Sequence, residues 1–198
     1  MKRNVLLGAA VLLLIAAIGV GQTSSRDTLS SLLLTQEEVR ELLSDQWVIQ
    51  TVGPLDQEPT GAISAQATFV NAQTEIELVD AMLAFEGGDS GRDWLNQVLE
   101  ADAVTGTRDL LAEAESSPDL LTDRLTAESD EIVLASLGET SQQLFQRRGS
   151  LITFLRTPAE GSAALGLESI VALADAQLGK VLELCDGAES PPGFCNGS

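Results

Sequence analysis

The segment from Gln142 to Arg156 constrains the fold of this chain more than any other. It reads QQLFQRRGSLITFLR, two runs rich in apolar residues on either side of Gly149 and Ser150. Glycine at the first central position suits a type II′ turn, which joins two antiparallel strands. This turn places like residues opposite each other: Phe145 with Phe154, Leu144 with Leu155, and Gln146 with Thr153. We therefore predict a hairpin, and with it an antiparallel sheet.

The longest predicted helix covers residues 165–184. Its apolar side chains recur at steps of three and four, which is the spacing of one helix face. They are Leu167, Ile170, Val171, Ala174, Leu178, Val181, Leu182 and Cys185. A stripe of this kind predicts a helix that packs on the sheet.

Shorter patterns fill the chain before the hairpin. Thr35 and Glu38 form the T-x-x-E signature of a capping box, which predicts a helix beginning at Gln36. Ser90 is the expected cap of a second helix, with Trp94, Leu95, Val98 and Leu99 on its apolar face. Strands are predicted over 47–52, 64–70 and 132–137, a loop over 55–62, and two short helices within 107–125.

Residues 74–85 fit two structures. Ile76 and Leu78 alternate with glutamates, as in a strand, whereas Ile76, Val79 and Leu83 also fit one face of a helix. We favour a strand with a bulge near Val79 and Asp80, where the alternation changes phase. The order of elements contains no regular βαβ alternation, so the sequence predicts an α+β fold with an antiparallel sheet packed by the long C-terminal helix.

The first residues have the pattern of an export signal. A positive head at Lys2 and Arg3 precedes the uncharged run VLLGAAVLLLIAAIGV. We expect residues 1–21 to be a signal peptide or a membrane anchor, 22–34 a linker, 35–184 a single α+β domain, and 185–198 a C-terminal tail. Under both readings of residues 1–21, the domain is extracytoplasmic, either secreted or anchored by the N-terminal helix.

Cys185 and Cys195 are the only cysteines. In an exported protein, a pair at this spacing predicts a disulfide that pins the tail to the last helix. We predict no cofactor and no metal site, because two thiolates without histidine are a poor zinc ligand set.

Charge and composition exclude several classes of function. The chain has a formal net charge of −19 and contains no histidine. An acidic protein lacks the basic groups that neutralise phosphates, so nucleic acid is not an expected partner. The same charge disfavours an anionic membrane surface, so we expect membrane contact only through the N-terminal segment. Any mechanism that needs an imidazole base is excluded.

Three remaining motifs have simpler structural explanations. Asp89-Ser90-Gly91 matches the triplet of aspartic proteases, but a helix start accounts for it. Lys180 could act as the base for a serine nucleophile. A position late in an amphipathic helix, where a cation interacts favourably with the helix dipole, is the simpler explanation for this lysine. Arg147 and Arg148 adjoin the hairpin turn and could clamp an anionic ligand, but exposed turn residues are the simpler explanation. We predict no catalytic residue.

Five stretches of the chain form a recognisable pattern: LLLTQEEVRELL (32–43), VDAMLAFEGG (79–88), SDEIVLAS (129–136), LFQRRGSLITFL (144–155) and ALADAQLGKVLEL (172–184). Together they resemble the extracytoplasmic sensor-like domains of actinobacterial serine/threonine kinases and related exported proteins. The resemblance implies a compact α+β domain that binds a ligand or partner in a cleft and performs no catalysis.

From these observations we expect an exported, non-enzymatic domain that binds a small ligand or an envelope partner. A structural or assembly protein of the cell envelope is an alternative, and a carboxylate-based secreted hydrolase is a further one. An apolar cleft would favour binding, whereas two carboxyl groups converging in a pocket would favour the hydrolase. A flat apolar patch would favour assembly.

Overall fold

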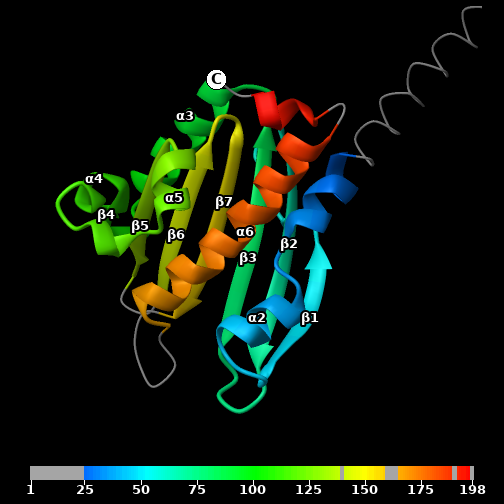
Figure 1. The fold of residues 1–198 in the computed structure, drawn as a ribbon, viewed down its shortest axis with the longest axis vertical. Coiled ribbons are helices and arrows are strands. Elements are labelled where there is room, and N and C mark those ends of the chain that lie inside the picture. Colours follow the sequence, from blue (N-terminus) through cyan, green and yellow to red (C-terminus); the bar gives the residue numbers. More distant parts are fainter. Residues whose placement is uncertain (1–24, 139–140, 159–164, 189–190, 197–198) are drawn as a thin grey trace, which may run out of the picture.

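The computed structural model describes residues 25–138, 141–158, 165–188 and 191–196. Its centre is one seven-stranded sheet in the order β1-β2-β3-β7-β6-β5-β4, and every neighbouring pair is antiparallel (Figure 1). The predicted α+β class with an antiparallel sheet is therefore confirmed. The strands are β1 (Trp47–Gly53), β2 (Ala62–Asn71), β3 (Glu77–Phe85), β4 (Val104–Asp109), β5 (Glu131–Leu137), β6 (Ser141–Arg148) and β7 (Leu151–Pro158).

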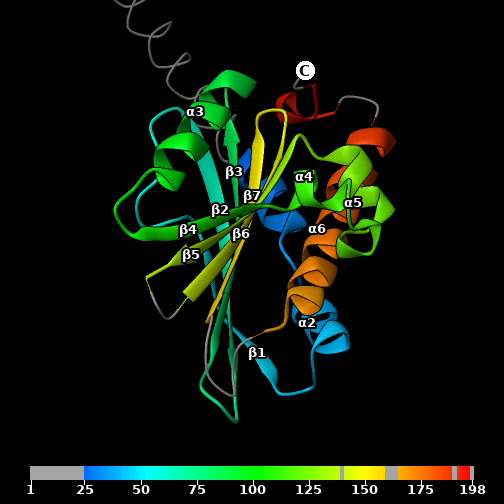
Figure 2. The same cartoon turned by 90° about the vertical axis from the view of Figure 1, so that its left-hand side faces the viewer.

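The helices cover the two faces of this sheet unequally. Figure 2 shows α3 (Gly88–Leu99) on one side of the sheet and the other labelled helices on the opposite side. That opposite side, here called the covered face, carries α2 (Gln36–Leu42), α4 (Leu110–Ala114), α5 (Asp123–Glu128) and α6 (Leu167–Gly187). Two short 3₁₀ helices, η1 (Pro118–Leu120) and η2 (Gly193–Asn196), complete the fold. The side that carries only α3 is called the open face below.

The predicted hairpin is confirmed with its register. Strands β6 and β7 pair Phe145 with Phe154 across the turn. Gly149 has φ 56°, a left-handed conformation that glycine adopts without steric cost. The paired phenylalanines point to the open face, whereas the neighbouring pair, Leu144 and Leu155, points to the covered face.

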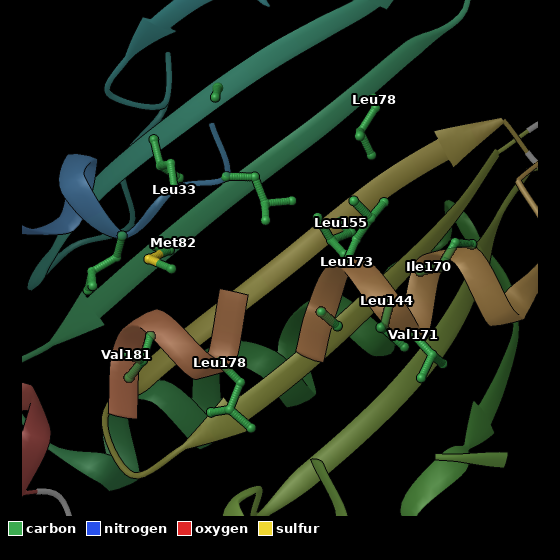
Figure 3. Packing of buried hydrophobic residues seen from close by; sticks show 14 of the residues in the cluster. Leu33, Leu78, Met82, Leu144, Leu155, Ile170, Val171, Leu173, Leu178 and Val181 are labelled. Atoms are coloured by element: carbon green, nitrogen blue, oxygen red, sulfur yellow. The ribbon is translucent and has the colours of Figure 1, made fainter. Parts of the chain in front are cut away.

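Helix α6 packs on the covered face along its whole length. Figure 3 shows its apolar side chains between the helix and the sheet, beside Met82, Leu144 and Leu155. Two residues outside the predicted stripe, Leu173 and Gln177, are also fully buried. The buried stripe is therefore wider than the three-and-four spacing predicts, because helices on both flanks of α6 also cover it.

Residues 77–85 form β3, so the helical alternative for this segment is wrong. The bulge expected near Val79 and Asp80 is also wrong, because β3 pairs with β2 without interruption. Every residue of β3 after Glu77 is buried. A strand covered on both faces loses the alternation of polar and apolar residues, which explains why the sequence pattern changes phase there.

The linker predicted over residues 22–34 is corrected by the structure for its described part. Residues 25–32 are helical, and Leu29, Leu32, Leu33 and Leu34 are all at most 4% exposed within the covered-face core. The physical reason is the concentration of four leucines in six residues, whose burial outweighs the polar character of the residues before them.

Two further boundaries differ from the prediction. Residues 104–109 form the edge strand β4, which includes the first three residues of the segment 107–125, where two short helices were expected. Pairing with β5 stabilises this polar segment, which has little strand pattern of its own. Helix α3 begins at Gly88 after Gly87, without a side-chain cap, so Ser90 lies inside its first turn.

The predicted signal peptide or anchor, residues 1–21, lies outside the described residues. Within residues 25–196, apart from the short gaps, no helix has the length and apolar character needed to cross a membrane.

Candidate ligand-binding site

The open face contains a hollow of about 400 Å³ between α3, the loop after β1, and strands β6 and β7. Phe145 and Phe154 form its sheet side, and Trp94 and Val98 of α3 form one wall. Gln143 and four residues of the loop, Leu55, Gln57, Glu58 and Pro59, complete the lining. A volume of this size is within the range of small-molecule sites, roughly 300–1,000 Å³.

The aromatic side chains of this hollow form one connected cluster. The ring centroid of Trp94 lies 5.8 Å from that of Phe85 and 6.4 Å from that of Phe145, which in turn lies 5.8 Å from Phe154. Trp94 and Val98 are four residues apart and so share one face of α3. The hairpin register and the helix period therefore bring the same cluster together from two parts of the chain.

The loop that borders the hollow is held by Glu58. Its Oε1 accepts hydrogen bonds from the Ser64 backbone N–H at 3.0 Å and from Ser64 Oγ at 2.7 Å. Arg26 Nη2 lies 2.9 Å from the same oxygen. Burial alone would raise the pKa of Glu58, but the hydrogen bonds from Ser64 and the charge of Arg26 lower it instead. The loop is thus tied to β2 and to the helical segment at residues 25–32.

A second hollow of about 490 Å³ adjoins the first and shares Leu55 and Gln57 with it. Its lining is polar and includes Asp56, Glu77 and Arg156, with Gln66, Thr68 and Val79. Arg156 Nη2 lies 3.5 Å from Glu77 Oε1, and both side chains are about half exposed. Two carboxyl groups line this hollow, but the salt bridge to Arg156 engages one of them.

Asp80 is the one fully buried acid that the structure describes, and it points to the covered face. Its Oδ2 accepts a hydrogen bond from the Leu34 backbone N–H at 2.6 Å, and its Oδ1 accepts one from Gln177 Nε2. Asp80 therefore joins β3 to α6 and to the segment that precedes α2. Burial raises the pKa of Asp80 to about 7, although both hydrogen bonds and the charge of Lys180 oppose that rise.

Cys185 and Cys195 are joined by a disulfide with an S–S distance of 2.03 Å and a Cα–Cα distance of 5.4 Å. The bond links the last turn of α6 to η2, and both cysteines pack against the covered-face core. Phe194, beside the disulfide, is 8% exposed. The cysteine pair thus holds the end of the chain against the core, away from the two hollows.

The three motifs considered for catalysis or anion binding are engaged in local interactions. Asp89 pairs with Arg92 one turn later in α3, at 2.7 Å. Lys180 lies 3.1 Å from Glu38 and donates to the carbonyl of Leu33. Arg147 and Arg148 pair with acids of the α5–β5 region: Asp130, Glu131 and Glu128. None of these residues lines either hollow.

Sequence reasoning identified the aromatic residues but not their shared site. Trp94, Val98, Phe145 and Phe154 were all expected in the core, from helix spacing or hairpin register. Their assembly into a hollow depends on the position of the loop after β1, which follows from the contact between Glu58 and Ser64. For Asp80, the one available signal is a single acid inside the apolar run of β3.

No family model, curated protein or solved structure matches this chain. Within the part of the chain that the structure describes, no group of three or more histidine, cysteine, aspartate or glutamate side chains is placed to hold a metal ion.

Proposed function

We propose that this chain is an exported, non-enzymatic domain that binds a small apolar ligand in the aromatic hollow of the open face. The observation that carries the proposal is the cluster of Trp94, Phe145 and Phe154 around a space of about 400 Å³. Removing an apolar ligand from water over such a surface contributes roughly 25 cal/mol per Å² of buried area.

The hydrolase alternative has less support at this site. The aromatic hollow contains one carboxyl group, Glu58, and that group holds the adjoining loop through Ser64 and Arg26. Glycoside hydrolysis by carboxylates needs two carboxyl groups on either side of the reacting bond. The adjoining polar hollow adds Asp56 and Glu77, but Glu77 is paired with Arg156, so among the described lining residues Asp56 has no second free carboxyl group beside it. Binding requires no such pair.

The assembly alternative rests on a few separate exposed side chains. The large apolar side chains that the structure describes as exposed are Leu42, Val48 and Val52. They lie on α2 and the edge strand β1, and Val48 and Val52 point to opposite faces of the sheet, as their partners Val70 and Ala67 do. An aromatic hollow of about 400 Å³ is a more specific feature than three separate side chains.

The setting of the proposed function is extracytoplasmic. It is inferred from the charged head and apolar run at residues 1–21 and from the disulfide between Cys185 and Cys195. A sensor-like role, in which the bound ligand reports on the outside of the cell, agrees with the resemblance to the sensor-like domains of actinobacterial kinases.

The test is binding of N-phenyl-1-naphthylamine, a neutral apolar dye whose fluorescence rises in apolar sites. We expect saturable binding to the wild-type protein. Val98→Asn should weaken it at least about fivefold, because it replaces an apolar contact in the wall of the hollow by an amide that an apolar ligand must desolvate. Fluorescence titration gives the Kd of each protein.

Val48→Asn is the matched control, since it makes the same substitution at an exposed residue of β1 outside the hollow. It should bind the dye like the wild type. Equal binding by a folded Val98→Asn protein, or no saturable binding by the wild type, would contradict the proposal. Leu55→Asn in the loop provides the same test from the opposite wall if Val98→Asn does not fold.

A further inference from the structure

We infer that the ligand is an amphipathic organic cation, with its apolar body in the aromatic hollow and its positive group in the adjoining polar hollow. This inference rests on the proposed function and specifies the chemical class of the ligand. It follows from the continuity of the two hollows and from the charges that line the polar one.

The two hollows are parts of one depression in the open face. They share Leu55 and Gln57 in the loop after β1. On the sheet side, Arg156 of the polar hollow lies two residues from Phe154 on β7 and pairs in register with Gln143 of the aromatic hollow. A ligand that lies on Phe154 therefore extends directly toward the polar side chains.

The fixed charges of this depression are mainly negative. Asp56 and Glu77 line its polar part, and Glu58 lines its aromatic part. Glu77 is paired with Arg156, and Glu58 with Arg26. Asp56 is exposed, and it has no hydrogen bond or ion pair with any of the residues that the structure describes. One carboxylate thus faces the depression without a counter-charge.

The net charge of the whole chain also favours a cationic ligand. At a net charge of −19, the protein raises the local concentration of cations and lowers that of anions in its clefts. Arg156 is the one basic residue among the described residues that line the two hollows, and it faces a carboxylate. An anionic ligand would therefore meet more repulsion than attraction at this site.

The experiment compares three ligands that share a ten-carbon chain: decyltrimethylammonium, decanol and decanoate. Each displaces N-phenyl-1-naphthylamine from the wild-type protein at low ionic strength. We expect the ammonium to displace the dye at a concentration about two- to fivefold lower than decanol, the range of an exposed ion pair. Decanoate should need the highest concentration.

Two variants should change this preference in opposite directions. Asp56→Asn should lower the ammonium preference over decanol to near one. Arg156→Gln should raise it by about two- to fivefold, because it leaves Glu77 without its counter-charge. Asp119→Asn is the matched control: it removes the same charge from η1, outside both hollows, and should leave the preference within about 1.5-fold of the wild type.

The outcomes separate this inference from the proposed function. Two results would overturn the inference of a cationic ligand and leave the aromatic hollow as the binding site. One is dye binding without any preference for the ammonium, and the other is a preference for decanoate that Arg156→Gln removes. Absence of dye binding in the wild type would overturn both. If Asp56→Asn and Asp119→Asn reduced the preference for the ammonium over decanol equally, that preference would come from the net charge alone. This result would also contradict the inference.

Discussion

The two faces of the sheet are built from the same strands but differ in what covers them. The covered face is closed by α6, α2, α4, α5 and residues 25–34, and its core excludes water almost completely. Among the residues that the structure describes, the open face is covered by α3 and the loop after β1, which leave two adjoining hollows. The difference shows that packing closes one face, whereas the other keeps accessible hollows, which is where we propose that a ligand binds.

Strand β3 shows this division residue by residue. Leu78, Asp80 and Met82 point to the covered face, where even the acid is fully buried and hydrogen-bonded. Val79 and Ala81 point to the open face, where Val79 lines the polar hollow. A single strand thus contributes to the closed core and to the lining of the polar hollow on alternate residues.

The largest expected effect compares Leu155 with Phe154, consecutive residues of β7 that point to opposite faces. Leu155→Ala should cost about 4 kcal/mol, because it leaves a cavity in a closed core. Phe154→Ala should cost only about 2 kcal/mol, although the side chain is larger, because the space it leaves opens into an existing hollow. Urea unfolding measures both.

Phe154→Ala should also change dye binding, whereas Leu155→Ala, under conditions where it remains folded, should not. If Phe154→Ala proved as destabilising as Leu155→Ala, the open face would be as closed as the covered one, and the comparison of the faces would be wrong.

The second prediction concerns Asp80. Its pKa is raised to about 7 in the folded protein from an ordinary value of 3.8, so folding favours the neutral form. As the pH rises, the unfolded chain releases this proton before the folded protein does. The stability of the fold therefore decreases between the two pKa values. The free energy of unfolding of the wild type, minus that of Asp80→Asn, should fall by about 1.4 kcal/mol per pH unit from pH 4 to 7 and then level off.

Subtracting the values for Asp80→Asn removes the contributions of Glu38, Glu58 and Asp175, which both proteins share. The pKa values of these three groups are lowered in the folded protein, so their contributions to stability are lost as the pH falls below their ordinary pKa values. Urea unfolding at several pH values provides the measurement. A difference that rises with pH would mean that Asp80 stabilises the fold as an anion, held by Leu34 and Gln177.

The third prediction concerns the disulfide at the end of α6. Replacing Cys185 and Cys195 by serine should cost about 2–3 kcal/mol, the range of the chain-entropy model for a loop this short. Dye affinity should stay within about twofold, because the bond lies outside both hollows. Thiol labelling of the native, unreduced protein should find no free cysteine, and two labelled thiols would contradict the pairing.

The parts of the fold that the sequence predicted are those set by local patterns. The hairpin register follows from one glycine and matched side-chain pairs, and α6 follows from its period. The segments that were mispredicted depend on distant partners. Residues 25–32 form a helix that buries its leucines against the sheet, and β4 is a strand because β5 pairs with it.

The candidate site was less predictable than the fold. Its aromatic residues come from α3, β6 and β7, and its remaining wall comes from a loop whose sequence, LDQEPTGA, gives no sign of its position. The cleft itself lies on the face opposite α6. Which face of a sheet remains open is decided by where helices pack, and a periodic pattern identifies a buried stripe without identifying its partner.

The most direct test of the open face as the binding face uses the two tryptophans of the chain. Trp94 lines the aromatic hollow, whereas Trp47 is 3% exposed in the covered-face core. In a two-dimensional ¹H–¹⁵N NMR spectrum, each tryptophan gives one indole N–H signal, and Trp47→Phe assigns them. Titration with decanol should shift the Trp94 signal progressively and leave the Trp47 signal in place. A shift of Trp47 with Trp94 unmoved would place the ligand on the covered face and contradict the division of roles between the two faces.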